Sequence, residues 1–376
     1  MERSKYAIKN TLGMFDLLKG VMMILMIMAH TYGLFDVLYT YINTEDSATA
    51  QNPVVLFLIL LFMAFGEASM PVLFVISGYG FRKTTFKKTV DKQFKTLIIP
   101  YLITMCVTCV MHFVIYFLLF RPGGRETTVQ TLKLFLSFLF GFSTETNYFG
   151  IHLGVCGPVW FLLALFIGNV IFNELLNRFE GIKLLIAASA VSLIGWLLSL
   201  GSPIPWAISQ GLVAVLFLCL GYMAKKYKIF TSGKNPALRA IVVLTIVVSS
   251  FIMKAFAGEF NMALNAYSWG PVSIVVGGLF SCVSVYLFLY LNRFKGKISE
   301  FIRKIGRLSL YVLCIHAIEM MSMGVYVQYD LINNWQGNRR VACWLVFAAR
   351  FAIVMVGTFG FVQVKDFIAK KKETNN

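Results

Sequence analysis

Near its start the chain contains the stretch Phe15-Asp16-Leu-Leu-Lys19-Gly-Val-Met-Met-Ile-Leu-Met-Ile-Met-Ala-His30. Ten uncharged residues separate Lys19 from His30, which is typical of a membrane-spanning helix. Eleven helical positions rise about 16 Å and make close to three turns, so both side chains project from nearly the same face. Asp16 lies three positions before Lys19 and can pair with it. Because ionisable groups inside a bilayer are costly and usually functional, we take Asp16, Lys19 and His30 as candidate catalytic residues.

The composition points to an integral membrane protein. Hydrophobic residues make up 58% of the chain and charged residues 14%, and the mean hydropathy is +0.75; both are far from the values of soluble domains. The net charge is +17, but the basic residues fall in short clusters between apolar segments. That arrangement follows the positive-inside rule and excludes a nucleic-acid-binding domain.

Apolar windows of about 20 residues predict ten spans. Of the 34 Lys and Arg residues, 26 fall in segments on one side of these spans and 6 on the other, which predicts two cytoplasmic termini. We therefore expect an all-α polytopic protein in which 1–376 form a single membrane domain and 365–376 a basic cytoplasmic tail. The extracytoplasmic loop 120–154 contains an apolar stretch, 132–142, that is either re-entrant or interfacial. The predicted spans are 12–34, 54–82, 96–119, 155–177, 183–201, 206–224, 239–257, 270–291, 305–327 and 341–364.

A second stretch with candidate functional residues begins at Met70-Pro71 and ends at Arg82 and Lys83. Its small residues, among them Ser77 and Gly78, either let helices approach closely or leave room beside a ligand. An arginine fork at its end suits a phosphate or a carbonyl oxygen. We take Ser77, Tyr79, Arg82 and Lys83 as candidate cofactor-binding residues; the lysines after Arg82 equally fit ordinary positive-inside charge.

The remaining polar groups at membrane depth are candidate substrate-binding residues. His316 and Glu319 are spaced i, i+3 and share one helical face, either as a satisfied pair or as part of a site. No third ligand converges on them in the sequence, and all seven cysteines lie in or beside apolar segments, so we expect no metal. Arg350 lies within a span and needs an internal partner, with Glu319 and Glu67 the obvious choices. The candidate substrate-binding residues are Glu67, Trp160, His316 and Glu319.

Four motifs, in order over about 10–320, resemble signatures of the membrane-bound acyltransferase family 3. The first is Asp16-x-x-Lys19-Gly20 with His30 downstream, and the second is Phe74-Val-Ile-Ser77-Gly78-Tyr79. Pro158-Val-Trp160-Phe161-Leu resembles a third signature, and Gly306-x-x-Ser309-x-Tyr311 through His316 resembles the late-helix signature. Met70-Pro71 and Phe217-Leu-Cys-Leu-Gly221-Tyr222 look more like the branch of fucose and sugar O-acetylases.

The resemblance implies ten spans and the transfer of an acyl group, usually acetyl from cytoplasmic acetyl-CoA, to a hydroxyl of a surface carbohydrate at a bacterial plasma membrane. It carries over His30 as the essential histidine, Lys19 as the motif cation and Arg82 as the cation ending the second motif. Several relatives have Arg-x-x-Arg there, whereas Thr85 stands three positions after Arg82 in this chain. The implied partners are acyl-CoA, the carbohydrate acceptor and the lipid bilayer.

Alternatives remain open at this point. His30 serves either as a general base near neutral pH or as a transiently acylated nucleophile. The rival function is a transporter or flippase for an anionic or glycan solute, in which Lys19 and the two histidines relay protons. A non-catalytic sensor subunit is a third reading. The sequence also leaves open the acceptor, the acyl chain and oligomerisation.

Overall fold

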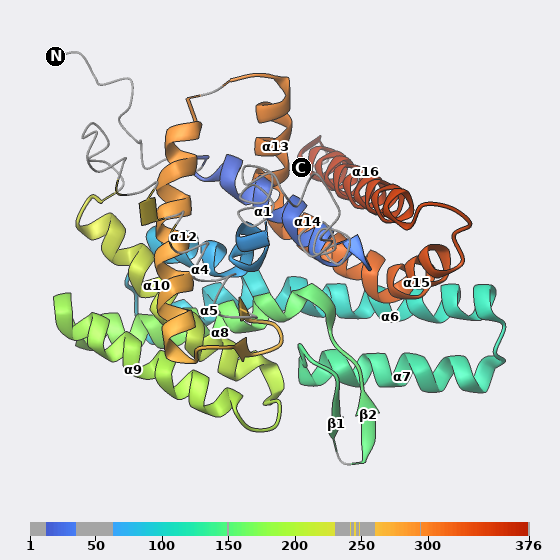
Figure 1. Cartoon of the computed structure of the whole chain (residues 1–376), viewed down its shortest axis with the longest axis horizontal. Helices are drawn as coiled ribbons and strands as arrows, with labels where there is room; N and C mark the ends of the chain where they lie inside the picture. Colours follow the sequence, from blue (N-terminus) through green and yellow to red (C-terminus); the bar gives the residue numbers. More distant parts are fainter. Residues whose placement is uncertain are drawn as a thin grey trace, which may run out of the picture.

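The computed structural model describes residues 13–34, 63–148, 150–229, 260–293 and 295–374, with Ile241, Leu244, Thr245 and Val248. Within these ranges the chain is helical apart from connecting segments and two small antiparallel hairpins (Figure 1). One hairpin pairs β1 (Thr146–Tyr148) with β2 (Ile151–Leu153), and the other pairs β3 (Phe260–Asn261) with β4 (Ala266–Tyr267). The predicted all-α membrane class is confirmed.

The described residues contain six helical segments that are long and apolar enough to cross a bilayer. Each covers one predicted span, and the bent pair Lys297–Arg307 and Ser309–Ser322 makes a seventh candidate. The predicted span 239–257 and the first part of 54–82 lie almost wholly outside the described residues, as do Arg3, Lys5, Lys9 and Lys254. The count of ten spans and the side of the termini therefore stay predictions. The six segments are Phe86–Leu119, Gly157–Arg178, Gly181–Ser199, Pro205–Lys226, Pro271–Leu291 and Arg339–Lys371.

The main helices of the described residues are named in chain order. Their bounds are α1 Asp16–Ala29, α4 Ser69–Gly80, α5 Phe86–Gln93, α6 Ile99–Phe120, α7 Gly124–Phe140, α8 Trp160–Arg178, α9 Gly181–Ser199, α10 Ile208–Lys226, α12 Pro271–Leu291, α13 Lys297–Arg307, α14 Ser309–Glu319, α15 Val325–Asn333 and α16 Arg339–Thr374. π-Helical turns join α5 to α6 (Phe94–Ile98) and α14 to α15 (Met320–Gly324). Short 3-10 turns precede α8 (Gly157–Val159) and α10 (Pro205–Ala207).

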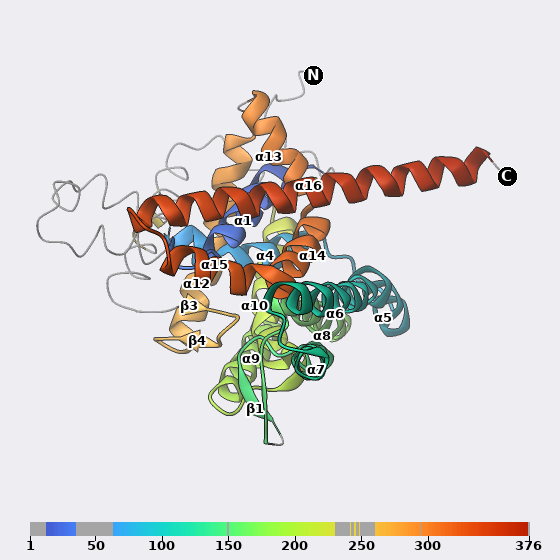
Figure 2. The ribbon, with the colours of Figure 1, turned by 90° about the vertical axis from the view of Figure 1, so that its right-hand side faces the viewer.

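Helix α1 lies at the centre of the molecule (Figures 1 and 2). It packs against α4, α12, α13, α14 and α16, and most of its residues are buried. A helix that is apolar around most of its circumference is expected to be enclosed by others. Its 14 residues rise only about 21 Å, less than the hydrocarbon thickness of a bilayer. A helix this short has room for both of its ends inside the hydrocarbon layer.

Glycines allow the closest helix contacts. A Cβ on Gly20 would overlap the carbonyl oxygen of Ile302, and one on Gly306 would overlap that of Asp16, so α1 and α13 meet backbone to backbone. Gly78 and Gly221 join α4 to α10 in the same way. Gly20, Gly78 and Gly306, from the first, second and late signatures, therefore allow close helix packing. For Gly78 this is the alternative in which a small residue lets two helices approach each other.

Two further predicted segments, 132–142 in the loop 120–154 and 365–376 at the C-terminus, are largely helical. The apolar stretch 132–142 forms the second half of α7, which packs alongside α6 and precedes the β1–β2 hairpin (Figure 1). Helix α16 continues to Thr374, so most of the basic segment 365–376 extends that helix away from the other elements (Figure 2).

Candidate functional site

His30 lies immediately after α1, beside a histidine from the other end of the chain. Its Nδ1 is 2.8 Å from the carbonyl oxygen of Met26, one helical turn back. The same Nδ1 is 3.4 Å from Nε2 of His316, which is fully buried on α14. The two rings have centroids 5.3 Å apart. The structure thus joins two predicted site residues that are 286 positions apart.

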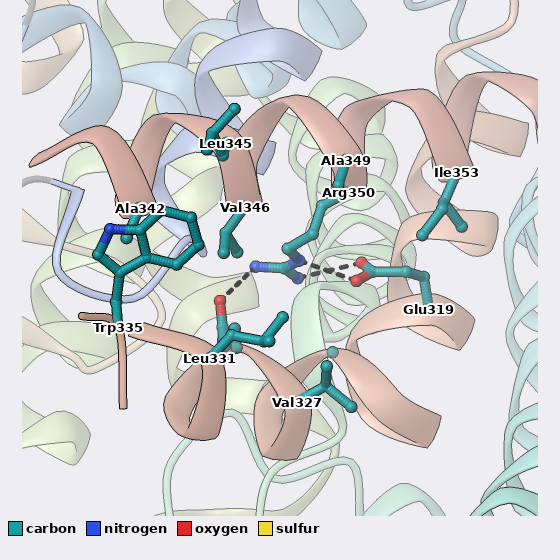
Figure 3. A pocket seen from close by; sticks show the side chains of 12 residues that line it. Glu319, Val327, Leu331, Trp335, Ala342, Leu345, Val346, Ala349, Arg350 and Ile353 are labelled. Carbon is teal, nitrogen blue, oxygen red and sulfur yellow. Dashed lines mark hydrogen bonds and ion pairs between the residues drawn. The ribbon is translucent and has the colours of Figure 1, made fainter. Parts of the chain in front are cut away.

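A carboxylate and a guanidinium extend this contact on the far side of His316. The Nδ1 of His316 lies 3.3 Å from Oε2 of Glu319, as their spacing on one helical face allows. Glu319 then accepts two hydrogen bonds from Arg350, from Nε at 2.8 Å and from Nη2 at 3.0 Å (Figure 3). Such a bidentate pair is strong and fixes geometry. Glu319 is therefore the partner of Arg350, one of the two carboxylates proposed for it.

The remaining nitrogen of Arg350 closes the network onto α1. Its Nη1 donates to the backbone carbonyl of His30 and, at 2.9 Å, to Oε1 of Gln328. The same Gln328 oxygen accepts the backbone N–H of Tyr32 at 3.0 Å. Carbonyls at the end of a helix lack intrahelical partners and carry partial negative charge, so a buried cation is well placed there. Arg350 therefore holds the backbone at the His30 carbonyl, and Gln328 holds it at the N–H of Tyr32.

This geometry specifies the proton on His30. A carbonyl oxygen only accepts, so the neutral ring that bonds to Met26 carries its hydrogen on Nδ1. Nε2 then has a lone pair, and it makes no hydrogen bond within the part of the chain that the structure describes. A neutral imidazole with one nitrogen held and the other unprotonated is the form that accepts a proton or attacks an acyl group.

The opposite end of α1 carries a separate cluster of charges. Lys19 Nζ lies 3.3 Å from Oδ1 of Asp16, and Nε of Arg307 lies 3.8 Å from Oδ2 of the same carboxylate. Asp16 is buried, and the expected i, i+3 pair is present. Since α1 is one continuous helix, Lys19 lies about 16 Å along its axis from His30. The structure therefore divides the first motif between two ends of a helix.

Comparison with known protein families identifies the chain. Residues 13–364 match the family described as Acyltransferase domain. The chain belongs to acyltransferase family 3. No curated protein and no solved structure matches it. Family 3 membership makes the protein a membrane acyltransferase, in agreement with its ordered motifs, whereas the sugar O-acetylase branch stays a prediction.

The second signature of this acyltransferase lies on α4 and the linker after it. Ser77 is half-buried, and Tyr79 is buried with its ring 5.1 Å from that of Phe15. Lys225 from α10 places its Nζ 5.9 Å from the Tyr79 ring centre. Arg82 and Lys83 are exposed in the non-helical linker between α4 and α5. Lys225, Arg82 and Lys83 thus lie at or just after the C-terminal end of α4. The contact between Tyr79 and Phe15 places this end of α4 beside the start of α1.

The other predicted site residues have their own surroundings. Trp160 is buried at the start of α8, with its ring in edge contact with Phe161. Glu67 is half-buried, in a helical turn just before α4. Both stay predictions as substrate-binding residues.

Two residues that contact the network, Gln328 and Gly324, have no signal in the sequence. Gln328 falls one position beyond the predicted span 305–327, and its contact with Arg350 crosses 22 positions. Gly324 lies against the Glu319 carboxylate, where a Cβ would overlap Oε1. Both residues are positioned by the π-helical turn Met320–Gly324, and hydrophobic periodicity does not reveal such a turn.

Proposed function

We propose that the protein is an O-acyltransferase that moves an acyl group, acetyl in the simplest case, from cytoplasmic acyl-CoA to a hydroxyl of a carbohydrate at the outer face of a bacterial plasma membrane. The observation that carries the proposal is the His30 ring, whose Nδ1 lies 2.8 Å from the Met26 carbonyl oxygen, so that the neutral ring has its lone pair on Nε2. Family membership supplies the reaction class, and this ring supplies a group able to perform it.

In the proposed reaction Nε2 of His30 accepts the proton of the acceptor hydroxyl. The hydroxyl oxygen bonds to the thioester carbon, the carbon–sulfur bond breaks, and the CoA thiolate takes the proton back from His30. The Met26 carbonyl at Nδ1 and the Glu319 carboxylate behind His316 favour the imidazolium that forms in between. In the second route, Nε2 attacks the thioester carbon, the carbon–sulfur bond breaks and the CoA thiolate leaves. The acceptor hydroxyl then attacks the acyl carbon, the bond to Nε2 breaks, and the thiolate takes the hydroxyl proton.

The donor would enter from the end of α1 that carries Lys19. The exposed Arg82 and Lys83 offer cations for the phosphates of CoA, with Ser77 and Tyr79 on the adjoining turn of α4. Lys19, paired with Asp16, is the cation on α1 at this end, about 16 Å along the helix from His30. No metal has a role in this proposal.

The test is mass spectrometry of surface glycans from cells that express wild type, His30→Ala, His152→Ala or no protein, at matched membrane levels. His152 is an exposed histidine on β2 and serves as the control. We expect the acyl increment with wild type and His152→Ala only. Equal acylation by His30→Ala would overturn the role of His30. The absence of any acylated product would contradict acyl transfer to a surface glycan and leave solute transport as the function to test.

A shorter experiment separates the two chemical routes. Purified wild type is incubated with acetyl-CoA labelled in the acetyl group, without acceptor, and then denatured. Label retained on the peptide that contains His30 supports transient acylation. Its absence, in a preparation that acylates acceptor added separately, supports the general base.

A further inference from the structure

A pocket of about 300 Å³ lies between α15 and α16, behind the Glu319–Arg350 pair (Figure 3). Its walls are almost entirely apolar, and the pair and Gln328 provide the polar groups on one side. The pocket does not include His30 or His316 among its lining residues. It is therefore distinct from the proposed site of acyl transfer, although the two share a wall. The apolar lining includes Val327, Leu331 and Trp335 on one side and Leu345, Ala349 and Ile353 on the other.

The rim of the pocket belongs to a lipid-facing surface. Leu331, Leu345 and Ile353 line the pocket and are each roughly half exposed. Helix α16 is a candidate span, and the exposed apolar side chains Trp344 and Val356 continue along it. In a bilayer, an exposed apolar stripe on a span faces hydrocarbon. The medium outside this pocket is therefore lipid chain rather than water.

The dimensions fit one lipid chain. The lining on α16 runs from Ala342 to Ile353, a rise of about 16 Å, which is close to half of a bilayer core about 30 Å thick. Trp335 lies at the Ala342 end of the pocket (Figure 3), and tryptophan favours the level of the headgroups. A chain that starts at Trp335 and ends near Ile353 would occupy one leaflet.

We propose that this pocket binds a single hydrocarbon chain of a membrane lipid, from the leaflet at the Trp335 end. The bound chain covers the bilayer side of Glu319 and Arg350 and excludes water from the pair. Electrostatic interactions strengthen when water is excluded, so an occupied pocket stabilises the network that holds His30. Lipid binding does not depend on acyl transfer, and its test uses no acyl donor or acceptor.

The test compares two substitutions on neighbouring residues of α16. Both alanines are exposed, but only Ala349 lines the pocket, so Ala349→Phe fills it and Ala348→Phe adds the same ring outside the lining. Each protein is purified in detergent, depleted of lipid and mixed with palmitoyl-oleoyl phosphatidylglycerol. Native mass spectrometry then gives the bound lipid, and thermal unfolding gives the stabilisation that the lipid confers. We expect wild type and Ala348→Phe to bind one tightly held lipid, and Ala349→Phe to bind it about tenfold more weakly with little gain in Tm.

Equal lipid binding by the two phenylalanine variants would overturn the proposal, as would a wild type that holds no lipid beyond loose adducts. A graded series, Ala349→Val and Ala349→Leu, decides the matter if the phenylalanine variant fails to fold. In that series, lipid affinity falls as side-chain volume rises if the chain lies in the pocket, and stays constant if it does not.

Discussion

The two ends of α1 hold their charges in different ways. At the Asp16 end, the side chains of Lys19 and Arg307 are 25% and 63% exposed, and their contacts to the carboxylate are 3.3 and 3.8 Å long. At the His30 end, the side chains of His316, Glu319 and Arg350 are at most 5% exposed, and the guanidinium lies 2.8 Å from the carboxylate. Exposed pairs contribute about 0–1 kcal/mol, whereas breaking a buried pair costs about 3–5 kcal/mol. Of the two ends, the His30 end is therefore the more strongly preorganised.

The largest expected effect comes from breaking the buried pair. Glu319→Leu leaves the Arg350 guanidinium uncompensated at membrane depth and should lower the free energy of unfolding by about 3–5 kcal/mol. Arg350→Leu should cost a similar amount, and the double variant should cost less than the sum because no buried charge is left alone. Thermal or denaturant unfolding in detergent measures all three. Additive losses would mean that the two side chains do not interact.

Packing at the Asp16 end comes next. Gly306→Ala places a methyl group on the Asp16 carbonyl and pushes α13 away from α1, which should cost about 1–3 kcal/mol. Gly80→Ala is the matched control, because a Cβ there has no neighbour within 4 Å. Comparison of their Tm values under identical conditions checks the contact. An unchanged Tm for Gly306→Ala would mean that α1 and α13 do not pack this closely.

Removal of the contact behind His30 should affect catalysis more than binding. His316→Gln takes away the ring next to His30, and we expect kcat to fall about tenfold to a hundredfold, a part of what a general base contributes. KM for the acyl donor should stay unchanged, since the proposed donor residues lie at the other end of α1. His112→Gln is the control, as His112 is another buried histidine, bonded to Thr131 on α7. A rise in KM with constant kcat would assign His316 to donor binding.

The smallest effect is expected at the exposed pair. Arg307→Ala leaves Asp16 its contact with Lys19, so the loss should stay below about 1 kcal/mol and shrink as salt is added. Unfolding measured at low and high ionic strength checks this. A loss as large as that of Glu319→Leu would remove the contrast between the two ends of α1.

Much of the scaffold could be predicted because hydropathy acts locally. Six of the predicted spans coincide with apolar helices, and helical spacing correctly placed Lys19 beside Asp16 and His316 beside Glu319. The predicted span over 305–327 stays a prediction. Helix α13 ends at Arg307, in the first residues of that span, and the chain turns there by 77° into α14.

The assembled site was beyond prediction for a physical reason. Sequence patterns report which face a residue occupies within its own helix, whereas the contact of His30 with His316 depends on how two distant helices pack. Gln328 carries no charge, so nothing in its own segment marks it as a partner of Arg350. The proposed roles of Lys19, Arg82 and Trp160 remain predictions on the same ground, since their positions are known and their ligands are not.

The hydrogen bond from Arg350 to the His30 carbonyl also bears on biosynthesis. Its two residues are separated by 320 positions, and ribosomes add about 5–20 residues per second. The first apolar helix therefore waits on the order of tens of seconds for the last one. For most of that interval the residues of α14, α15 and α16 that contact the end of α1 have not been synthesised. The site around His30 is therefore assembled only after the final segment has entered the membrane. A nascent chain that is released early has no active centre.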